Sequence, residues 1–217
     1  MRTQSPGCSP GLSRQSGFTL VEVIVVLSVI LLLTGIAVPM LSSYMEDGRR
    51  ARAESECKTL GAAVMSFYKD VGTYPSRNAS GTDNTRYTLV TGTAVPTSNP
   101  WTATSTWQTW AMSSTYGDTL DNHLLTNTPG GQTSAAYATT GNMRWRGPYT
   151  SGMAPLDPWG RPYVVNVISG WYSHATNYKR IWVLSAGPDG TFSTNSLATK
   201  TTEITGDDIG MMISQKN

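Results

Sequence analysis

The feature that most constrains this chain is a long apolar run near its N-terminus, from Phe18 to Val38. A helix of this length spans roughly 31 Å at about 1.5 Å per residue, which matches the hydrocarbon core of a bilayer. The only charged side chain in the run is Glu22, near its start. An ionisable group at such a position is costly and indicates a functional role with a cationic partner.

Two simpler interpretations of this run compete with a role in assembly. A secretory signal peptide also has basic residues before an apolar stretch and small residues near its end, here Gly35 and Ala37. A single-pass anchor would place Glu22 near the membrane edge, where a charge costs less than the roughly 2.5 to 3.5 kcal/mol assigned to the bilayer centre. Neither interpretation gives the carboxylate a partner.

The start of the run resembles the cleavage and assembly signature of type IV pilins and type II secretion pseudopilins, carried here by Gly17, Phe18, Thr19, Leu20, Glu22 and Pro39. The resemblance implies that prepilin peptidase removes the basic leader, residues 1–17, and that the new amine of Phe18 is methylated. It also implies that Glu22 pairs with the Phe18 amine of a neighbouring subunit. Because an unpaired carboxylate is costly in apolar surroundings, this pair would set the register between subunits.

A second helical segment is predicted over residues 40–75, after a kink or local break at Pro39. Its apolar side chains recur every three or four residues, at Cys57, Leu60, Val64, Phe67 and Val71. Gly72 and Pro75 then end the helix. With the apolar segment 18–39 it would be on the order of 80 Å long, so its first half needs a membrane or identical helices around it.

A mixed charge cluster follows the apolar run, at Glu46, Asp47, Arg49, Arg50 and Arg52. It fits either a solvated helix face or salt bridges between subunits. The next segment, residues 76–146, is rich in Ser, Thr, Gly and Asn and holds several tryptophans, so we expect a folded, loop-rich insertion rather than disorder. Trp101, Trp107 and Trp110 are interpreted as local core, with a ligand platform as the alternative.

The C-terminal segment, residues 147–217, carries the strand patterns. A turn at Asp157 to Gly160 precedes an alternating stretch from Tyr163 to Ile168, and a second strand is expected from Lys179 to Ala186. Packed on the amphipathic helix, this antiparallel pair gives an α+β fold. The stretches LDPWGRPY and LSAGPDG resemble the corresponding parts of the major pseudopilin of type II secretion systems.

Three acidic residues near the C-terminus form a candidate metal site. Asp207 and Asp208 are adjacent, so their repulsion favours a nearby cation, and calcium accepts carboxylate, carbonyl and water oxygens. The spacing after Asp189 does not match an EF-hand. The resemblance to the major pseudopilin implies that Asp189, Asp207 and Asp208 bind a calcium ion that orders the C-terminal loop.

Other classes of function are disfavoured. Arg2 and Arg14 of the leader account for the formal charge of +2, and a neutral remainder offers no basic face for nucleic acid. The sequence has no HExxH, GxSxG, P-loop or dinucleotide motif, and His123 and His174 lie in different segments. We therefore expect a protein that is not an enzyme. Removal of the leader, with Cys8, would leave Cys57 without a disulfide partner, as a buried side chain.

The leading hypothesis is a structural subunit of a type II secretion pseudopilus. It would be a single-pass protein of the bacterial inner membrane with its C-terminal domain in the periplasm, and would polymerise into a periplasmic filament that supports protein export. The resemblance implies partners: other copies, minor pseudopilins, prepilin peptidase and the inner-membrane assembly platform. Two alternatives stay open, a type IV pilus subunit for adhesion, motility or DNA uptake, and a membrane-anchored binding module.

Overall fold

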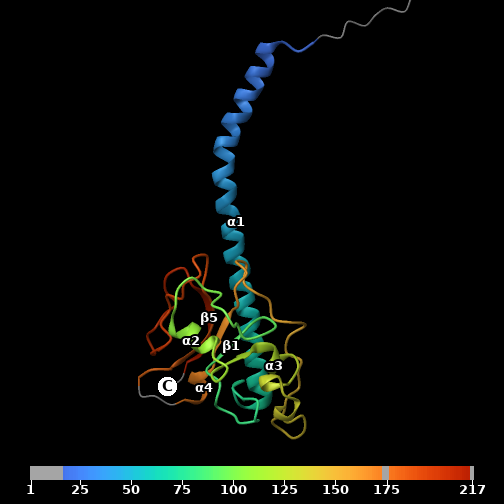
Figure 1. Cartoon of the computed structure of the whole chain (residues 1–217), viewed down its shortest axis with the longest axis vertical. Coiled ribbons are helices and arrows are strands. Elements are labelled where there is room, and N and C mark those ends of the chain that lie inside the picture. Colours follow the sequence, from blue (N-terminus) through green and yellow to red (C-terminus); the bar gives the residue numbers. More distant parts are fainter. Residues whose placement is uncertain (1–16, 173–175, 216–217) are drawn as a thin grey trace, which may run out of the picture. The chain divides into compact units, whose positions relative to one another are not determined.

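The computed structural model describes residues 17–172 and 176–215. The chain divides into two compact units, an N-terminal one that ends at Met45 and a C-terminal one that begins at Glu46. Helix α1, Leu20–Val71, belongs to both (Figure 1). The predicted leader, residues 1–17, lies outside the described residues except for Gly17.

Helix α1 has a defined start and end. The hydroxyl of Thr19 accepts a hydrogen bond from the amide N of Glu22 at 3.2 Å, which caps the first turn. Helix α1 continues through Pro39, so the local break considered at this position is absent. A proline removes only one main-chain donor, which a helix of this length tolerates. Gly72 follows the last turn with a φ of +82°, a left-handed conformation that suits glycine, and the predicted stop is confirmed.

The C-terminal unit is built on a five-stranded sheet in the order β2-β1-β3-β4-β5. Its strands are β1 Thr88–Val90, β2 Gly117–Thr119, β3 Val164–Asn166, β4 Arg180–Ser185 and β5 Ile209–Gln215. The predicted antiparallel pair is confirmed, with Val164 opposite Leu184. The α+β class is confirmed as well.

The sheet is mixed rather than antiparallel throughout. Strands β1 and β2 run parallel, with Thr88 opposite Gly117, and both come from the predicted insertion. A parallel pair needs a crossover connection, and the segment between these strands provides it with helix α2, Thr106–Ala111. The insertion is therefore part of the sheet rather than an appendage to it.

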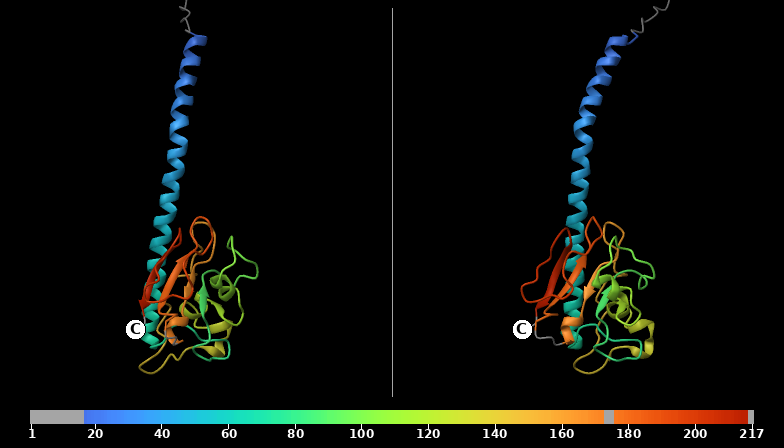
Figure 2. Two further views of the ribbon diagram at one scale, coloured as in Figure 1. Left: turned by 90° about the vertical axis from the view of Figure 1, so that its left-hand side faces the viewer. Right: turned by 60° about the vertical axis from the view of Figure 1, so that its left-hand side comes forward.

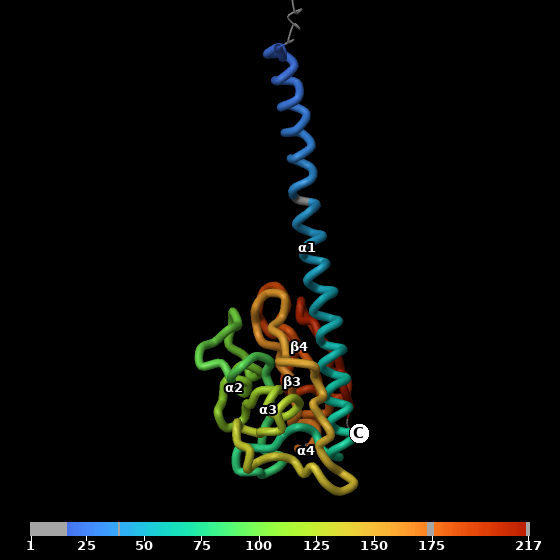
Figure 3. The backbone as a smooth tube through the Cα atoms, turned by 90° about the vertical axis from the view of Figure 1, so that its right-hand side faces the viewer, coloured from blue at the N-terminus to red at the C-terminus, as the bar shows by residue number. Residues whose placement is uncertain are grey.

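Both faces of the sheet are covered at its central strands, β3 and β4. On one face, Val165 and Val183 pack against the stripe of α1 in what we call the helix-side core, with Cys57, Leu60, Val64, Phe67 and the half-buried Val71. On the other face, Val164 and Leu184 pack in what we call the outer core, with Trp101, Trp107, Trp110 and Phe192. Figure 3 shows β3 and β4 between α1 and α2 in this unit. The period of two along each strand explains this division.

Strand β5 lies alongside the second half of α1 (Figure 2). A Cβ added to Gly61 would stand 3.2 Å from Sδ of Met211, so the small residue allows the strand to approach the helix. Short helices complete the unit: α3 Leu120–Leu124, α4 Ile168–Trp171 and the 3-10 turns Pro129–Gly131 and Thr133–Ala135. Leu120 and Leu124 of α3 join the helix-side core.

Candidate assembly segment and C-terminal loop

The N-terminal unit exposes its apolar side chains. Every described side chain from Phe18 to Met45 is exposed, with Pro39 the one position whose side chain is not described. Helix α1 is long and apolar enough to cross a membrane, by length and composition. A helix that is apolar on all sides is stable only in lipid or among other apolar surfaces. This segment therefore needs lipid or other apolar surfaces around it.

Glu22 lies beside Phe18 at the start of α1. The two side chains line a shallow groove of about 310 Å³ with Val23, Val26 and Leu27. The capping by Thr19 was not foreseen, although the pattern Thr-x-x-Glu is a known signal for a helix start. The first turn thus fixes the backbone that carries the one carboxylate of an otherwise uncharged segment.

The two C-terminal motifs, LDPWGRPY and LSAGPDG, meet at the buried carboxylate of Asp157. Its Oδ1 accepts hydrogen bonds from the amides of Trp159 at 3.1 Å and Arg161 at 2.8 Å, which closes the predicted turn. Its Oδ2 accepts a hydrogen bond from the hydroxyl of Ser185 at 2.7 Å. One side chain therefore holds both motifs.

Arg161 adds a second link between these motifs. Its Nη1 donates to the carbonyl of Gly187 at 2.9 Å, in the turn that follows β4. A Cβ on Gly190 would lie 2.5 Å from Cζ of Arg161, so only glycine leaves room for the guanidinium. The sequence alone did not reveal this role of Arg161, because the partners are far apart in the chain.

Part of the charge cluster on α1 is used within the C-terminal unit. The indole Nε1 of Trp159 contacts Oε2 of Glu46 at 3.5 Å. Further along the helix, Glu56 accepts a hydrogen bond from the hydroxyl of Tyr163 at 2.6 Å and pairs with Arg52 at 2.9 Å. These contacts tie the DPWGRPY segment to the helix.

The three acidic residues proposed for calcium lie in one loop. Oδ2 of Asp207 accepts a hydrogen bond from the amide of Asp189 at 3.1 Å. The intervening spacer folds back on itself, because the hydroxyl of Thr205 donates to the carbonyl of Ser193 at 2.9 Å. Among the described residues, however, no three acidic, histidine or cysteine side chains converge as a metal site.

Asp208 is the buried member of this loop, with 8% of its surface exposed. Its Oδ2 accepts hydrogen bonds from the amides of Ser193 at 2.9 Å and Thr194 at 2.6 Å, whereas its Oδ1 is buried without a partner. Burial raises the pKa of Asp208 to about 6, and the charge of Asp207 adds to the rise. A cation beside Oδ1 would satisfy this oxygen, so the donor chemistry fits a hard ion.

The remaining candidates among the described residues, three tryptophans, His123 and Cys57, are buried side chains. The tryptophans Trp101, Trp107 and Trp110 lie in the outer core, which confirms the interpretation as local core. His123 is fully buried between Asp118 and Tyr137, and His174 lies outside the described residues. Burial raises the pKa of the Cys57 thiol to about 12, which suits a packed side chain rather than a nucleophile.

Comparisons with known proteins match two separate segments of the chain. The family model for the prokaryotic N-terminal methylation motif matches residues 12–38, and the model for type II secretion system protein G matches residues 119–203. Fimbrial protein EcpC of Eikenella corrodens is 33% identical over 66 residues, which are 30% of this chain and 43% of that protein. The chain thus spans less than half of this relative. No solved structure matches the chain.

These matches agree with the geometry. The methylation motif covers Gly17, Phe18 and Glu22, and the second model covers both C-terminal motifs. An apolar helix, with its side chains exposed, precedes an α+β unit. Both family models describe structural subunits rather than enzymes. The chain belongs to the type IV pilin and type II secretion pseudopilin family.

Proposed function

We propose that this chain builds a type II secretion pseudopilus in the periplasm. Prepilin peptidase would cleave between Gly17 and Phe18, and the mature subunits would polymerise through α1 with the help of the inner-membrane assembly platform. The growing filament, with minor pseudopilins among its subunits, would support protein export. The observation that carries the proposal is an apolar segment whose described side chains are all exposed, with a single carboxylate at its start.

Glu22 is proposed to fix the register of the filament. Apolar burial between helices supplies the driving force for polymerisation, but apolar contacts are not directional. A carboxylate taken out of water is costly unless a cation meets it, and the freed amine of Phe18 in the next subunit would provide that cation. Phe18 and Glu22 are four residues apart at the start of α1 and line the same groove, so both groups stand at one end of the helix.

The test is a pair of substitutions in the native host. Glu22→Gln removes the charge but keeps the shape, so the subunit should still enter the membrane while filament yield and protein export are lost. Ser28→Ala, nearly two turns further along, removes only a hydroxyl that bonds to the carbonyl of Ile24 and should assemble normally. Wild-type filament yield from Glu22→Gln would refute the register role.

A surface type IV pilus is the second candidate. It is supported by the similarity to fimbrial protein EcpC, and by the insertion, which enlarges the domain with a second core. Protein export and surface filaments, measured in cells that lack the subunit, distinguish the two functions. Loss of a pseudopilus subunit should stop export, and loss of a pilus subunit should remove surface filaments. Normal export together with missing surface filaments would favour the pilus.

We also propose that the C-terminal loop binds one calcium ion. Asp208 would provide the central ligand, supported by its unpartnered Oδ1, and Asp189 and Asp207 would contribute charge from the same loop. Calcium accepts carbonyl and water oxygens as well, so three convergent carboxylates are not required. When bound, the ion would neutralise the repulsion between the adjacent acids and hold the loop to the sheet.

Thermal melting tests the calcium proposal. Calcium should raise the melting temperature of the wild-type protein in a concentration-dependent way, because it binds the folded state only. Asp208→Asn should abolish the shift, whereas Glu203→Gln, an exposed residue of the same spacer, should retain it. An equal melting temperature with and without calcium in the wild type would remove the ion from this loop.

A further inference from the structure

A buried arginine in the insertion lacks an acidic partner. Arg86 is 6% exposed, and its Nη1 donates to the carbonyls of Ser114 at 2.6 Å and Thr115 at 2.8 Å. Its Nε is buried and donates to no atom, and no ion pair among the described residues includes this guanidinium. Buried charges are normally paired, so Arg86 indicates a missing anionic partner.

Arg86 lines an open cavity of about 500 Å³. The loop 93–97 forms one part of its wall, and Thr119, Asn122 and Gly130 lie in another. Arg86 is the only basic side chain among the residues that line the cavity, and the single acid there is Asp118. The cavity therefore offers one cationic anchor in a lining of small and neutral groups.

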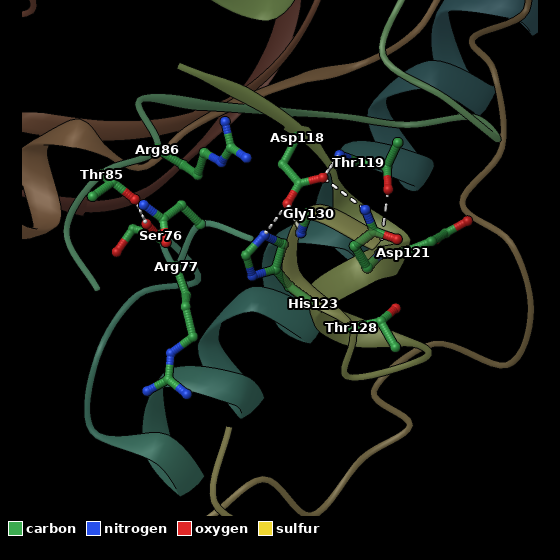
Figure 4. A network of polar contacts seen from close by, with 12 residues as sticks. Ser76, Arg77, Thr85, Arg86, Asp118, Thr119, Asp121, His123, Thr128 and Gly130 are labelled. Carbon is green, nitrogen blue, oxygen red and sulfur yellow. Dashed lines mark hydrogen bonds and ion pairs between the residues drawn. The ribbon is translucent and has the colours of Figure 1, made fainter. Parts of the chain in front are cut away.

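The carboxylate of Asp118 is already saturated with hydrogen bonds (Figure 4). Its Oδ1 accepts from the amide of Thr119 at 2.8 Å and from Nδ2 of Asn122 at 2.7 Å. Its Oδ2 contacts Nε2 of His123 at 3.0 Å and the amide of Gly130 at 2.7 Å. Since a carboxylate has about four acceptor positions, Asp118 has none left for Arg86.

The pKa of Asp118 agrees with this assignment. Burial works to raise its pKa, but the hydrogen bond and charge of His123, with further hydrogen bonds from Asn122 and Gly130, hold it below its usual value. The carboxylate thus stays ionised and committed to the α3 side of the cavity. An anionic ligand beside Arg86 is repelled by this fixed negative charge. The repulsion is larger for a phosphate dianion than for a carboxylate.

We propose that this cavity binds a carboxylate group, with Arg86 as its anchor. Nε and Nη2 of Arg86 donate to no described residue, and together they form the edge of a guanidinium that grips a carboxylate with two parallel hydrogen bonds. The neutral 93–97 loop would accept the aliphatic body of the ligand. Arg86 itself lies between the two family matches, which cover residues 12–38 and 119–203.

The carboxylate can come from a small organic acid or from the end of a peptide chain, and two probes distinguish these sources. Propionate represents the small acid, and N-acetyl-dialanine with a free carboxylate represents the peptide. N-acetyl-dialanine amide has the same body without the charge and serves as the control. Titrations follow the Nε–H resonance of Arg86 by NMR in the full mature chain in detergent micelles, assigned by its loss in Arg86→Gln.

The free-acid peptide, propionate or both should shift this resonance saturably, and the amide should not. Arg86→Gln should weaken binding by about tenfold or more, since hydrogen bonds between charged groups are lost. Arg144→Gln, which removes an arginine outside the cavity, should bind as the wild type does. If Arg86→Gln fails to fold, Arg86→Lys, which keeps the charge but has no guanidinium, assigns the resonance, and the wild-type titration then decides. The proposal would be overturned if the chemical shift of the Arg86 Nε–H did not change with either acid, or changed equally with the amide.

Discussion

The two units of this chain contain the same apolar residue types in opposite environments. Leu27 in the N-terminal unit is 53% exposed, whereas Leu89 in the sheet is fully buried. The C-terminal unit buries its apolar residues on both faces of one sheet, and the N-terminal unit has no second layer to pack against. The comparison shows that the C-terminal unit provides the stability of the fold. The N-terminal unit has apolar side chains that still need lipid or other subunits to pack against.

Removing the N-terminal unit tests this division most drastically. A chain that begins at Glu46 should stay soluble and monomeric, because both cores lie within it. The mature chain from Phe18 should aggregate without detergent, since large exposed apolar surfaces associate in water. Sedimentation and circular dichroism measure both outcomes. An unfolded or aggregated shorter chain would show that the C-terminal unit depends on the apolar segment.

Matched truncations of apolar side chains should separate the two regions next. Phe67→Ala empties the helix-side core and should lower the free energy of unfolding by about 3 to 5 kcal/mol. Leu27→Ala should leave that free energy unchanged in detergent but weaken filament assembly. Denaturant unfolding and filament yield give the two readouts. Equal destabilisation by both substitutions would contradict the division of roles.

The junction of the two C-terminal motifs should give an intermediate effect. Asp157→Ala leaves the amides of Trp159 and Arg161 and the hydroxyl of Ser185 without their acceptor. We expect a loss of about 2 to 3 kcal/mol in the free energy of unfolding. Asp47→Ala, at an exposed position of α1, is the control and should change it by less than about 0.5 kcal/mol. A loss no larger than that of the control would mean that the junction adds nothing.

The smallest effect should come from the titration of Asp208 in the absence of calcium. Its pKa in the folded protein is about 6, above its unfolded value, so the folded state binds the proton more tightly. The stability from this group is complete below the unfolded pKa and is lost as the pH rises through 6. Between pH 7 and pH 4 the wild type should gain about 1 to 2 kcal/mol relative to Asp208→Asn. Parallel pH profiles of the two proteins would exclude a raised pKa.

Local patterns explain which parts of the fold were predictable. The stripe of α1 and the pair of β3 and β4 follow from periods of 3.6 and 2 within single segments. Strands β1 and β2 have three residues each, too few for a period, and their pairing joins segments far apart in the chain. The burial of the tryptophans was expected, but their packing against Phe192 was not, because these residues meet only after the sheet has formed.

The candidate sites also include residues that the sequence indicated and residues that only the fold revealed. Gly17, Phe18 and Glu22 stand within a short motif, and the three acidic residues were visible as isolated charges. The roles of Arg161 and Arg86 depend on carbonyls 26 and 28 residues away, at Gly187 and Ser114, which no local pattern connects. The sequence likewise did not reveal that Oδ1 of Asp208 lacks a partner, because burial is a property of the whole fold.

The most direct measurement is the intact mass and N-terminal sequence of the protein recovered from the membranes of its host. If residues 18–45 form the assembly helix of a processed subunit, the chain should begin at Phe18 and carry a methylated amine. That result would give Glu22 its proposed cationic partner in the filament. A chain that begins near Val38 or Met40, or one that retains Met1, would contradict the assembly role of this helix.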